Sequence, residues 1–105
     1  MKIVETSVFT KRVKNLIPEE EYRKFQNELI LNPERGKIIK GSGGLRKIRW
    51  SIPGKGKSGG VRVIYYFVIQ RETILMLFVY TKSDQEDLTK DQLKILKSLV
   101  KEEFK

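Results

Sequence analysis

Three strand-like segments follow one another in the middle of the chain, and they restrict the fold more than any other feature. The segments are residues 45–52, 61–69 and 73–81. Apolar side chains alternate in the first two, leaving Lys47, Arg49 and Arg62 on the opposite face, whereas the third is apolar on both faces. Because consecutive strands with short connections pair as neighbours, we expect an antiparallel meander with helices covering its apolar face.

Helical periodicity flanks the predicted meander on both sides. Apolar residues recur at spacings of three and four in two segments before it and in one after it, which predicts a helical hairpin and a final helix. We place Pro18 at the first position of the second helix and the end of that helix at Asn32-Pro33. Thr89 and Gln92 form a capping-box pattern at the start of the last helix.

The predicted order of elements is β-α-α-β-β-β-α, beginning with a short strand at residues 2–5. This order predicts an α+β fold built on a small, antiparallel-rich sheet. The chain has 105 residues, and no repeat or linker divides it. We therefore expect a single domain covering residues 1–105.

The positive charge is concentrated in one part of the sequence. The formal net charge is +9, and residues 35–71 contain ten lysines or arginines but no acidic residue. The rest of the chain contains twelve basic and thirteen acidic residues, so the whole excess comes from this segment. A focused patch of this kind favours a polyanionic partner, and the alternative is a solvated strand surface.

Several classes of site are excluded by composition. The chain has no cysteine and no histidine, so it can form no disulfide or thiolate metal site and lacks the usual general acid-base residue. Residues 1–15 lack the apolar core of a signal peptide, and the longest apolar run has only seven residues. We expect a soluble cytoplasmic protein that does not associate with membranes.

The connection between the first two predicted strands is rich in glycine and lysine. Its sequence, GKGKSGGV, matches the spacing of a kinase phosphate loop, but the other kinase motifs are missing. A dinucleotide site is excluded as well, because a strand follows the loop instead of a helix. The residue types of this connection still suit an anion, because glycines let the backbone approach it and the two lysines supply charge. Asp84, Glu86 and Asp87 precede the last helix, where carboxylates complement the helix dipole more often than they bind a metal.

A cluster of cations could also cleave RNA without a metal ion. Lysine has an unperturbed pKa of about 10.4, and neighbouring cations lower it by disfavouring the protonated form. Lys55 and Lys57 lie just before Arg62, so one lysine could act as base or acid. Arg62 and Lys82 could then stabilise the pentavalent phosphate. Charge alone does not favour cleavage over plain binding.

Four aromatic residues accompany these cations. Trp50 and Tyr65 lie on the apolar faces of their predicted strands, so we expect them in the core. Tyr66 lies on the face of Arg62 and is expected to be open, where it could stack on a base. Tyr80, near a strand end and close to Lys82, is the aromatic residue that we would most readily place beside a ligand.

Three blocks of sequence resemble one known family. The blocks are GGLRKIRW, GKGKSGGVRVIYYF and LFVYTKSDQEDLT. They are similar to the RelE/HigB-like toxins of toxin–antitoxin pairs, and most of all to the HigB-type branch, and the resemblance covers nearly the whole chain. It implies a small curved sheet with flanking helices. It also implies a ribosome-dependent endoribonuclease that cleaves mRNA in the A site and leaves a 2′,3′-cyclic phosphate and a 5′-hydroxyl, with no metal or cofactor.

The same resemblance implies roles for named residues. Lys55, Lys57 and Arg62 match basic catalytic positions, with a lysine as base, Arg62 on the scissile phosphate, and Lys82 or Tyr80 on the leaving-group side. RNA phosphates or bases would be held by further residues, namely Arg46, Lys47, Arg49 and Tyr66. Some relatives carry a tyrosine in the final helix, whereas LTKDQLKILKSLVKEEFK has none, which leaves the choice of base and acid open.

The family also implies partners. They are a cognate antitoxin of the HigA-like type with a helix-turn-helix domain, the ribosome with its mRNA, and operator DNA reached only through the antitoxin complex. Two other functions stay open: a ParE-like toxin that inhibits a protein, and a non-catalytic RNA-binding module. The basic residues at positions 55, 57, 62 and 82 argue against the ParE-like alternative.

Overall fold

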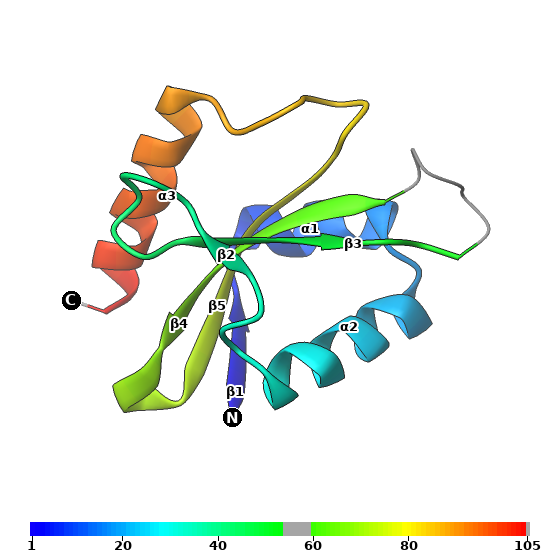
Figure 1. Ribbon diagram of the computed structural model, residues 1–105, viewed down its shortest axis with the longest axis horizontal. Helices are drawn as coiled ribbons and strands as arrows, with labels where there is room; N and C mark the ends of the chain where they lie inside the picture. The colour runs from blue at the N-terminus through cyan, green and yellow to red at the C-terminus, as the bar shows by residue number, and fades with distance from the viewer. Residues whose placement is uncertain (54–59, 105) are drawn as a thin grey trace.

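The computed structural model describes residues 1–53 and 60–104, and it contains a five-stranded sheet flanked by three helices (Figure 1). The elements in chain order are β1 (Lys2–Glu5), α1 (Ser7–Leu16), α2 (Glu19–Leu31), β2 (Lys37–Ile38), β3 (Arg46–Trp50), β4 (Val61–Val68), the 3-10 turn η2 (Ile69–Arg71), β5 (Thr73–Thr81) and α3 (Lys90–Glu103). The predicted α+β class and meander are confirmed. The structure adds β2, a two-residue strand that periodicity did not reveal.

The strands lie in the order β1-β5-β4-β3-β2. All neighbours are antiparallel except β1, which pairs in parallel with β5. The strand β5 therefore lies inside the sheet and is covered on both faces, as its uninterrupted apolar sequence predicts. No helix among the described residues is long and apolar enough to cross a membrane.

Helix ends follow the local sequence. Thr6 caps α1 by accepting a hydrogen bond from the Phe9 amide at 3.1 Å. Thr89 and Gln92 form the predicted capping box at the start of α3. The prediction for Pro18 is wrong by one position, because it is the N-cap of α2 and the helix begins at Glu19. Its extended ψ of 145° keeps it outside the helix.

Two apolar layers hold the sheet between the helices. One packs α1 and α2 against the face that carries Val63 and Tyr65, and the other packs α3 against the face that carries Ile64. Figure 1 shows α3 on one side of the sheet and the α1–α2 hairpin on the other. The face under α3 is covered by this single helix, and its apolar cluster includes Tyr80 but not Arg62.

A bulge in β5 changes which face Tyr80 occupies. Ile64 pairs with Phe78 but its neighbour Tyr65 pairs with Met76, so Leu77 is an extra residue on β5. The Thr6 hydroxyl donates a hydrogen bond to the Leu77 carbonyl at 2.9 Å, which fixes the bulge against the start of α1. Without the extra residue, Tyr80 would lie on the α1–α2 face, whereas the bulge places it on the α3 face.

Candidate nucleic-acid interface

Three residues form a row across neighbouring strands on the α3 face of the sheet. Arg49 of β3 lies directly across from Arg62 of β4, and Arg62 lies directly across from Tyr80 of β5. Neighbouring strands are about 4.8 Å apart, so the row spans about 10 Å. Two like charges placed directly opposite each other destabilise a sheet. This cost is offset when an anion lies between the two guanidinium groups, which makes the row a candidate phosphate site.

Arg49 is exposed, Arg62 is half-buried and Tyr80 is fully buried. The Tyr80 hydroxyl has no hydrogen-bond partner among the residues that the structure describes. Burial raises the pKa of Tyr80, the negative charge of Asp87 raises it further, and Arg62 and Arg49 act in the opposite direction. The phenol is therefore neutral at physiological pH and can donate a hydrogen bond to a ligand oxygen.

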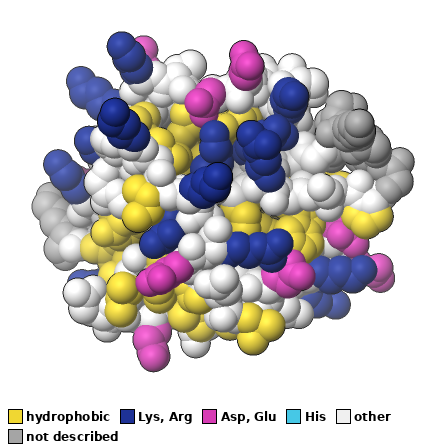
Figure 2. Space-filling model, in the orientation of Figure 1, with side chains coloured by type: hydrophobic (Ala, Val, Ile, Leu, Met, Phe, Trp, Pro, Cys, Tyr) yellow, Lys and Arg dark blue, Asp and Glu magenta, His cyan; other side chains and the backbone are white. Residues whose placement is uncertain are grey.

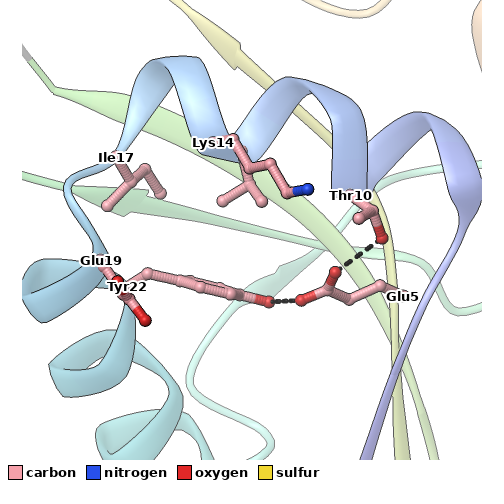
Figure 3. Close-up of a pocket in the computed structure, with 7 residues that line it drawn as sticks. Glu5, Thr10, Lys14, Ile17, Glu19 and Tyr22 are labelled. Carbon is pink, nitrogen blue, oxygen red and sulfur yellow. Dashed lines mark hydrogen bonds between the residues drawn. The ribbon is translucent and has the colours of Figure 1, made fainter.

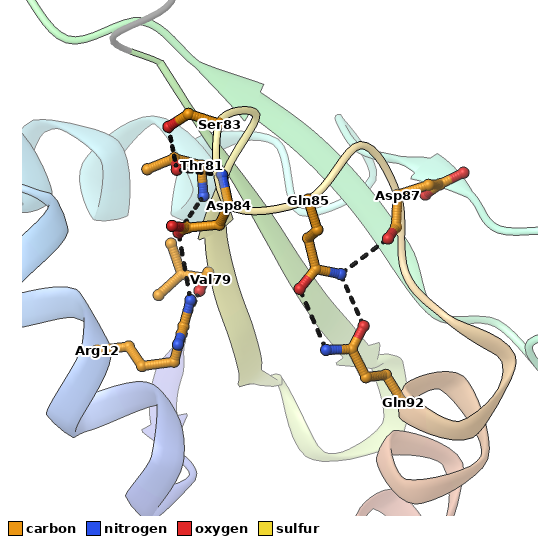
Figure 4. Close-up of polar contacts among 8 residues, drawn as sticks. All are labelled: Arg12, Val79, Thr81, Ser83, Asp84, Gln85, Asp87 and Gln92. Atoms are coloured by element: carbon orange, nitrogen blue, oxygen red, sulfur yellow. Dashed lines mark hydrogen bonds and ion pairs between the residues drawn. The ribbon is translucent and has the colours of Figure 1, made fainter.

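Asp87 connects the loop after β5 to this part of the sheet. Its carboxylate lies 3.4 Å from the Lys47 ammonium on β3 and accepts a hydrogen bond from the Leu88 amide at 2.9 Å. Gln85 donates to the Asp87 carbonyl and exchanges two hydrogen bonds with Gln92 of α3 (Figure 4). The hydrogen bonds of Gln85 and Gln92 fix the loop beside Tyr80. The contact with Lys47 gives Asp87 a cationic partner.

Asp84 fixes the other end of the same loop through its own contacts. It accepts a hydrogen bond from the Thr81 amide and lies 3.6 Å from the Arg12 guanidinium, which also donates to the Val79 carbonyl (Figure 4). Hydrogen bonds from the side chain and backbone of Thr81 lower the pKa of Asp84, and the charge of Arg12 contributes. Within the described ranges, 1–53 and 60–104, no group of three or more acidic residues is arranged to hold a metal ion.

The predicted catalytic residues are only partly located by the structure. Lys55 and Lys57 lie outside the described residues. The β3–β4 register pairs Trp50 with Val61, so the described residues on either side of that connection are at the Arg49–Arg62 end of the sheet. Lys82 is exposed in the loop that directly follows β5.

Two predicted RNA-binding residues lie elsewhere. The Arg46 guanidinium donates hydrogen bonds to the carbonyls of Glu34 and Gly36, at 3.1 and 2.8 Å, so it holds the segment that enters β2. Tyr66 is on the Arg62 face as predicted, but its ring is half-buried with its centre 6.4 Å from that of Phe104. The expectation that Tyr66 is open is therefore wrong, because α3 extends far enough to cover it.

A groove of about 410 Å³ contains two cations, Arg35 and Lys37, that the sequence did not single out. It is lined by Arg35, Lys37, Lys47, Ile48 and Arg49. Arg35 lies 5.8 Å from the centre of the Trp50 ring and pairs with Glu28 at 2.8 Å. Both Arg35 and Lys37 belong to the uninterrupted basic segment 35–71, which was the one available signal for them.

A second cavity, of about 430 Å³, lies between β1 and the helical hairpin (Figure 3). Its polar centre is Glu5, which accepts hydrogen bonds from the Tyr22 and Thr10 hydroxyls. Burial raises the pKa of Tyr22, and the hydrogen bond to Glu5 raises it further. Because these groups satisfy one another, we interpret the cluster as a structural link between β1, α1 and α2.

The protein is thus a small α+β protein with a cationic row on one face of its sheet. A protein-family model described as the RelE toxin of the RelE/RelB toxin–antitoxin system matches residues 1–105. The chain therefore belongs to the RelE toxin family. It is a toxin of a toxin–antitoxin system, and this membership indicates an endoribonuclease with a cognate antitoxin.

The fold is also found among solved structures. The chain is similar to a free-state mutant of the Escherichia coli toxin RelE, with a TM-score of 0.59 and 13% sequence identity. The match covers 81% of this chain and 86% of that one. At this identity the likeness concerns the fold alone.

Proposed function

We propose that the protein is a ribosome-dependent endoribonuclease that cleaves mRNA in the A site without a metal ion. The observation that carries the proposal is the row of Arg49, Arg62 and Tyr80, in which two opposed cations lie next to a buried hydroxyl that has no partner in the described part of the chain. The cations complement a phosphate, and the hydroxyl complements one of its oxygens. Dependence on the ribosome is proposed from the resemblance to RelE/HigB-like toxins.

The reaction needs two proton transfers and stabilisation of charge. The 2′-oxygen attacks the adjacent phosphorus, and the bond from phosphorus to the 5′-oxygen breaks, leaving a 2′,3′-cyclic phosphate and a 5′-hydroxyl. A base accepts the proton of the 2′-hydroxyl, and an acid returns a proton to the 5′-oxygen. Arg62, with Arg49 beside it, stabilises the negative charge that develops on the pentavalent phosphate.

The remaining roles follow the predicted assignments. We assign the base to Lys55 or Lys57, and the leaving-group side to Lys82 together with the neutral Tyr80 hydroxyl. Lys47 extends the cationic surface along β3 once its contact with Asp87 is exchanged for one with phosphate. Breaking the Lys47–Asp87 pair costs little stability, because exposed ion pairs contribute little to the free energy of unfolding.

Replacing Tyr80 by phenylalanine separates packing from chemistry. We expect Tyr80→Phe to raise the free energy of unfolding by about 1 kcal/mol, because it removes a buried hydroxyl that has no partner among the described residues. We expect cleavage to fall by about tenfold or more, because the same hydroxyl contacts the reacting phosphate. Denaturant titration and a cleavage time course measure the two effects.

Tyr65→Phe is the matched control. Its hydroxyl accepts a hydrogen bond from the Gly36 amide and donates one to the Pro33 carbonyl, both at 2.8 Å. Its loss should therefore destabilise the fold while leaving the cleavage rate of the folded protein unchanged. Equal cleavage by Tyr80→Phe and the parent would remove Tyr80 from the reaction.

Primer extension on an mRNA in a reconstituted translation reaction tests the proposed function. We expect new 5′ ends at in-frame codon positions when the protein and ribosomes are both present, and none when ribosomes are omitted. Cleavage of free RNA at the same rate would contradict ribosome dependence. RNA binding without cleavage in either reaction would instead favour a non-catalytic RNA-binding module. Growth inhibition without RNA binding and without cleavage would favour a ParE-like inhibitor of a protein.

The partner side of the proposal rests on the resemblance to RelE/HigB-like toxins. We place the protein in the HigB-type branch, acting in the cytoplasm, with a HigA-like antitoxin that carries a helix-turn-helix domain. An acidic or amphipathic segment of the antitoxin would cover the cationic row and so compete with mRNA. Operator DNA would be reached only through the antitoxin complex.

A further inference from the structure

The last helix carries a cationic surface of its own. Lys90, Lys94, Lys97 and Lys101 of α3 follow the spacing i, i+4, i+7, i+11. At 3.6 residues per turn these positions fall within an arc of about 60° and extend about 16 Å along the helix. The acidic residues of α3, namely Asp91, Glu102 and Glu103, fall outside this arc. We call these four residues the lysine stripe.

The stripe borders a groove of about 340 Å³ between α3 and the loop before β3. Gly41 of that loop contributes its carbonyl, which accepts a hydrogen bond from the Lys97 ammonium at 3.3 Å. Leu93 is the single apolar side chain in the lining, which is completed by Ser98. Figure 2 shows Lys and Arg side chains gathered over α3, beside a second group over the sheet.

The cost of the stripe argues that it has a ligand. Three pairs of its lysines are neighbours at spacings of three or four, and like charges at these spacings destabilise a helix by a few tenths of a kcal/mol each. Lys90 is also the first residue of α3, where the helix dipole disfavours a cation. None of these four side chains has a carboxylate within ion-pair distance among the described residues.

We propose that the lysine stripe binds the phosphate backbone of double-stranded RNA, at a site separate from the Arg49–Arg62–Tyr80 row. The choice of RNA rests on the proposed function, because a ribosome-dependent nuclease works among folded RNA helices. A stripe of about 16 Å is long enough to contact several successive phosphates of one strand of a duplex.

The composition of the groove distinguishes among partners. Single-stranded nucleic acid is bound by stacking on aromatic rings, and no aromatic residue lines this groove. Protein interfaces have apolar cores that are depleted of lysine, whereas this groove is mostly lysine. Interfaces with nucleic-acid duplexes are polar and strongly basic, and lysines act there as point charges on phosphates.

The test is the binding of a fluorescent 20-base-pair RNA duplex of arbitrary sequence, measured by anisotropy over a range of salt concentrations. The stripe variant carries Lys90→Gln, Lys94→Gln and Lys101→Gln, and Lys97 is kept because it holds the Gly41 loop. The matched control carries Lys11→Gln, Lys14→Gln and Lys24→Gln on α1 and α2, so both variants have the same net charge.

We expect the stripe variant to bind the duplex about tenfold or more weakly, and the slope of log affinity against log salt to fall by about three. The control should differ from the parent by less than about twofold. The melting temperature of the stripe variant should not fall, because the substitutions remove like-charge pairs. Arg62→Ala should retain duplex binding, which separates the two surfaces.

Two results would overturn the inference. Equal losses in both lysine variants would show that affinity follows net charge alone. A stripe variant that keeps its affinity for the duplex but no longer binds poly-glutamate would assign the stripe to an acidic polypeptide. The proposed nuclease function has a separate readout, because primer extension can fail while duplex binding depends on the stripe, and the reverse can also occur.

Discussion

Arg62→Ala is expected to reduce the rate of mRNA cleavage by about 10²- to 10³-fold while leaving the fold intact. Removing one group that stabilises a developing oxyanion has an effect of this size. Arg62 lies between Arg49 and Tyr80 in the row, so its loss leaves no cation next to the Tyr80 hydroxyl on the neighbouring strand. The initial rate of appearance of new 5′ ends in a translation reaction measures the effect.

The fold should tolerate Arg62→Ala because the substitution removes repulsion from Arg49 across the strand pair. Arg23→Ala is a suitable control, since Arg23 is an exposed arginine on α2 that pairs with Glu19 of the same helix at 3.8 Å. It should cleave like the parent. Arg62→Lys keeps the charge but loses the two-pronged geometry, and we expect an intermediate rate. Parent-like cleavage by Arg62→Ala would place the chemistry elsewhere.

The sequence was most informative where the apolar pattern of a strand is either continuous or strictly alternating. The bounds of β5 and the start of β4 were predicted to the residue, and Lys47, Arg49 and Arg62 were placed on one face. The register confirms this placement because alternation is strict in β3 and in β4 up to Ile64. Strands of this kind carry their own pattern, so sequence reasoning suffices for them.

Local pattern failed where a distant contact decides the conformation. The bulge at Leu77 depends on Thr6, which is 71 residues away, and nothing in residues 73–81 alone indicates it. The face of Tyr80 therefore could not be obtained by counting along β5. The role of Arg46 was missed for a similar reason, because its carbonyl partners lie in the segment that follows α2.

The burial of Tyr80 also changes how the site is understood. An exposed tyrosine near a strand end suggests a platform for stacking, whereas a buried one leaves only its hydroxyl to act. The open stacking surface that Tyr66 was expected to supply is likewise occupied by contact with α3. The described part of the interface is therefore a surface of charges with a buried hydroxyl beside it, which suits the phosphate backbone better than the bases.

Phe25→Ala is expected to lower the free energy of unfolding by about 3–5 kcal/mol, the range for emptying a buried phenylalanine site. Phe25 is 1% exposed, and its ring meets Trp50 edge-on with 5.1 Å between centres. Trp50 is the last residue of β3 and follows Arg49 directly. Because domains of this size have total stabilities of about 5–15 kcal/mol, the loss is a large fraction of the whole. Urea titration followed by tryptophan fluorescence measures it.

The same substitution should also reach the cationic row, because Trp50 loses the ring that fixes the end of β3. Phe25→Leu fills most of the cavity, so it should recover more than half of the lost stability. If the row depends on a fixed β3 end, cleavage at a temperature where both variants are folded should follow the same order, with Phe25→Ala below Phe25→Leu and both above Arg62→Ala. Parent-like cleavage by a measurably destabilised Phe25→Ala would mean that the position of Arg49 is set by its pairing with Arg62 alone, and that the aromatic layer beneath β3 supports the fold without supporting the site.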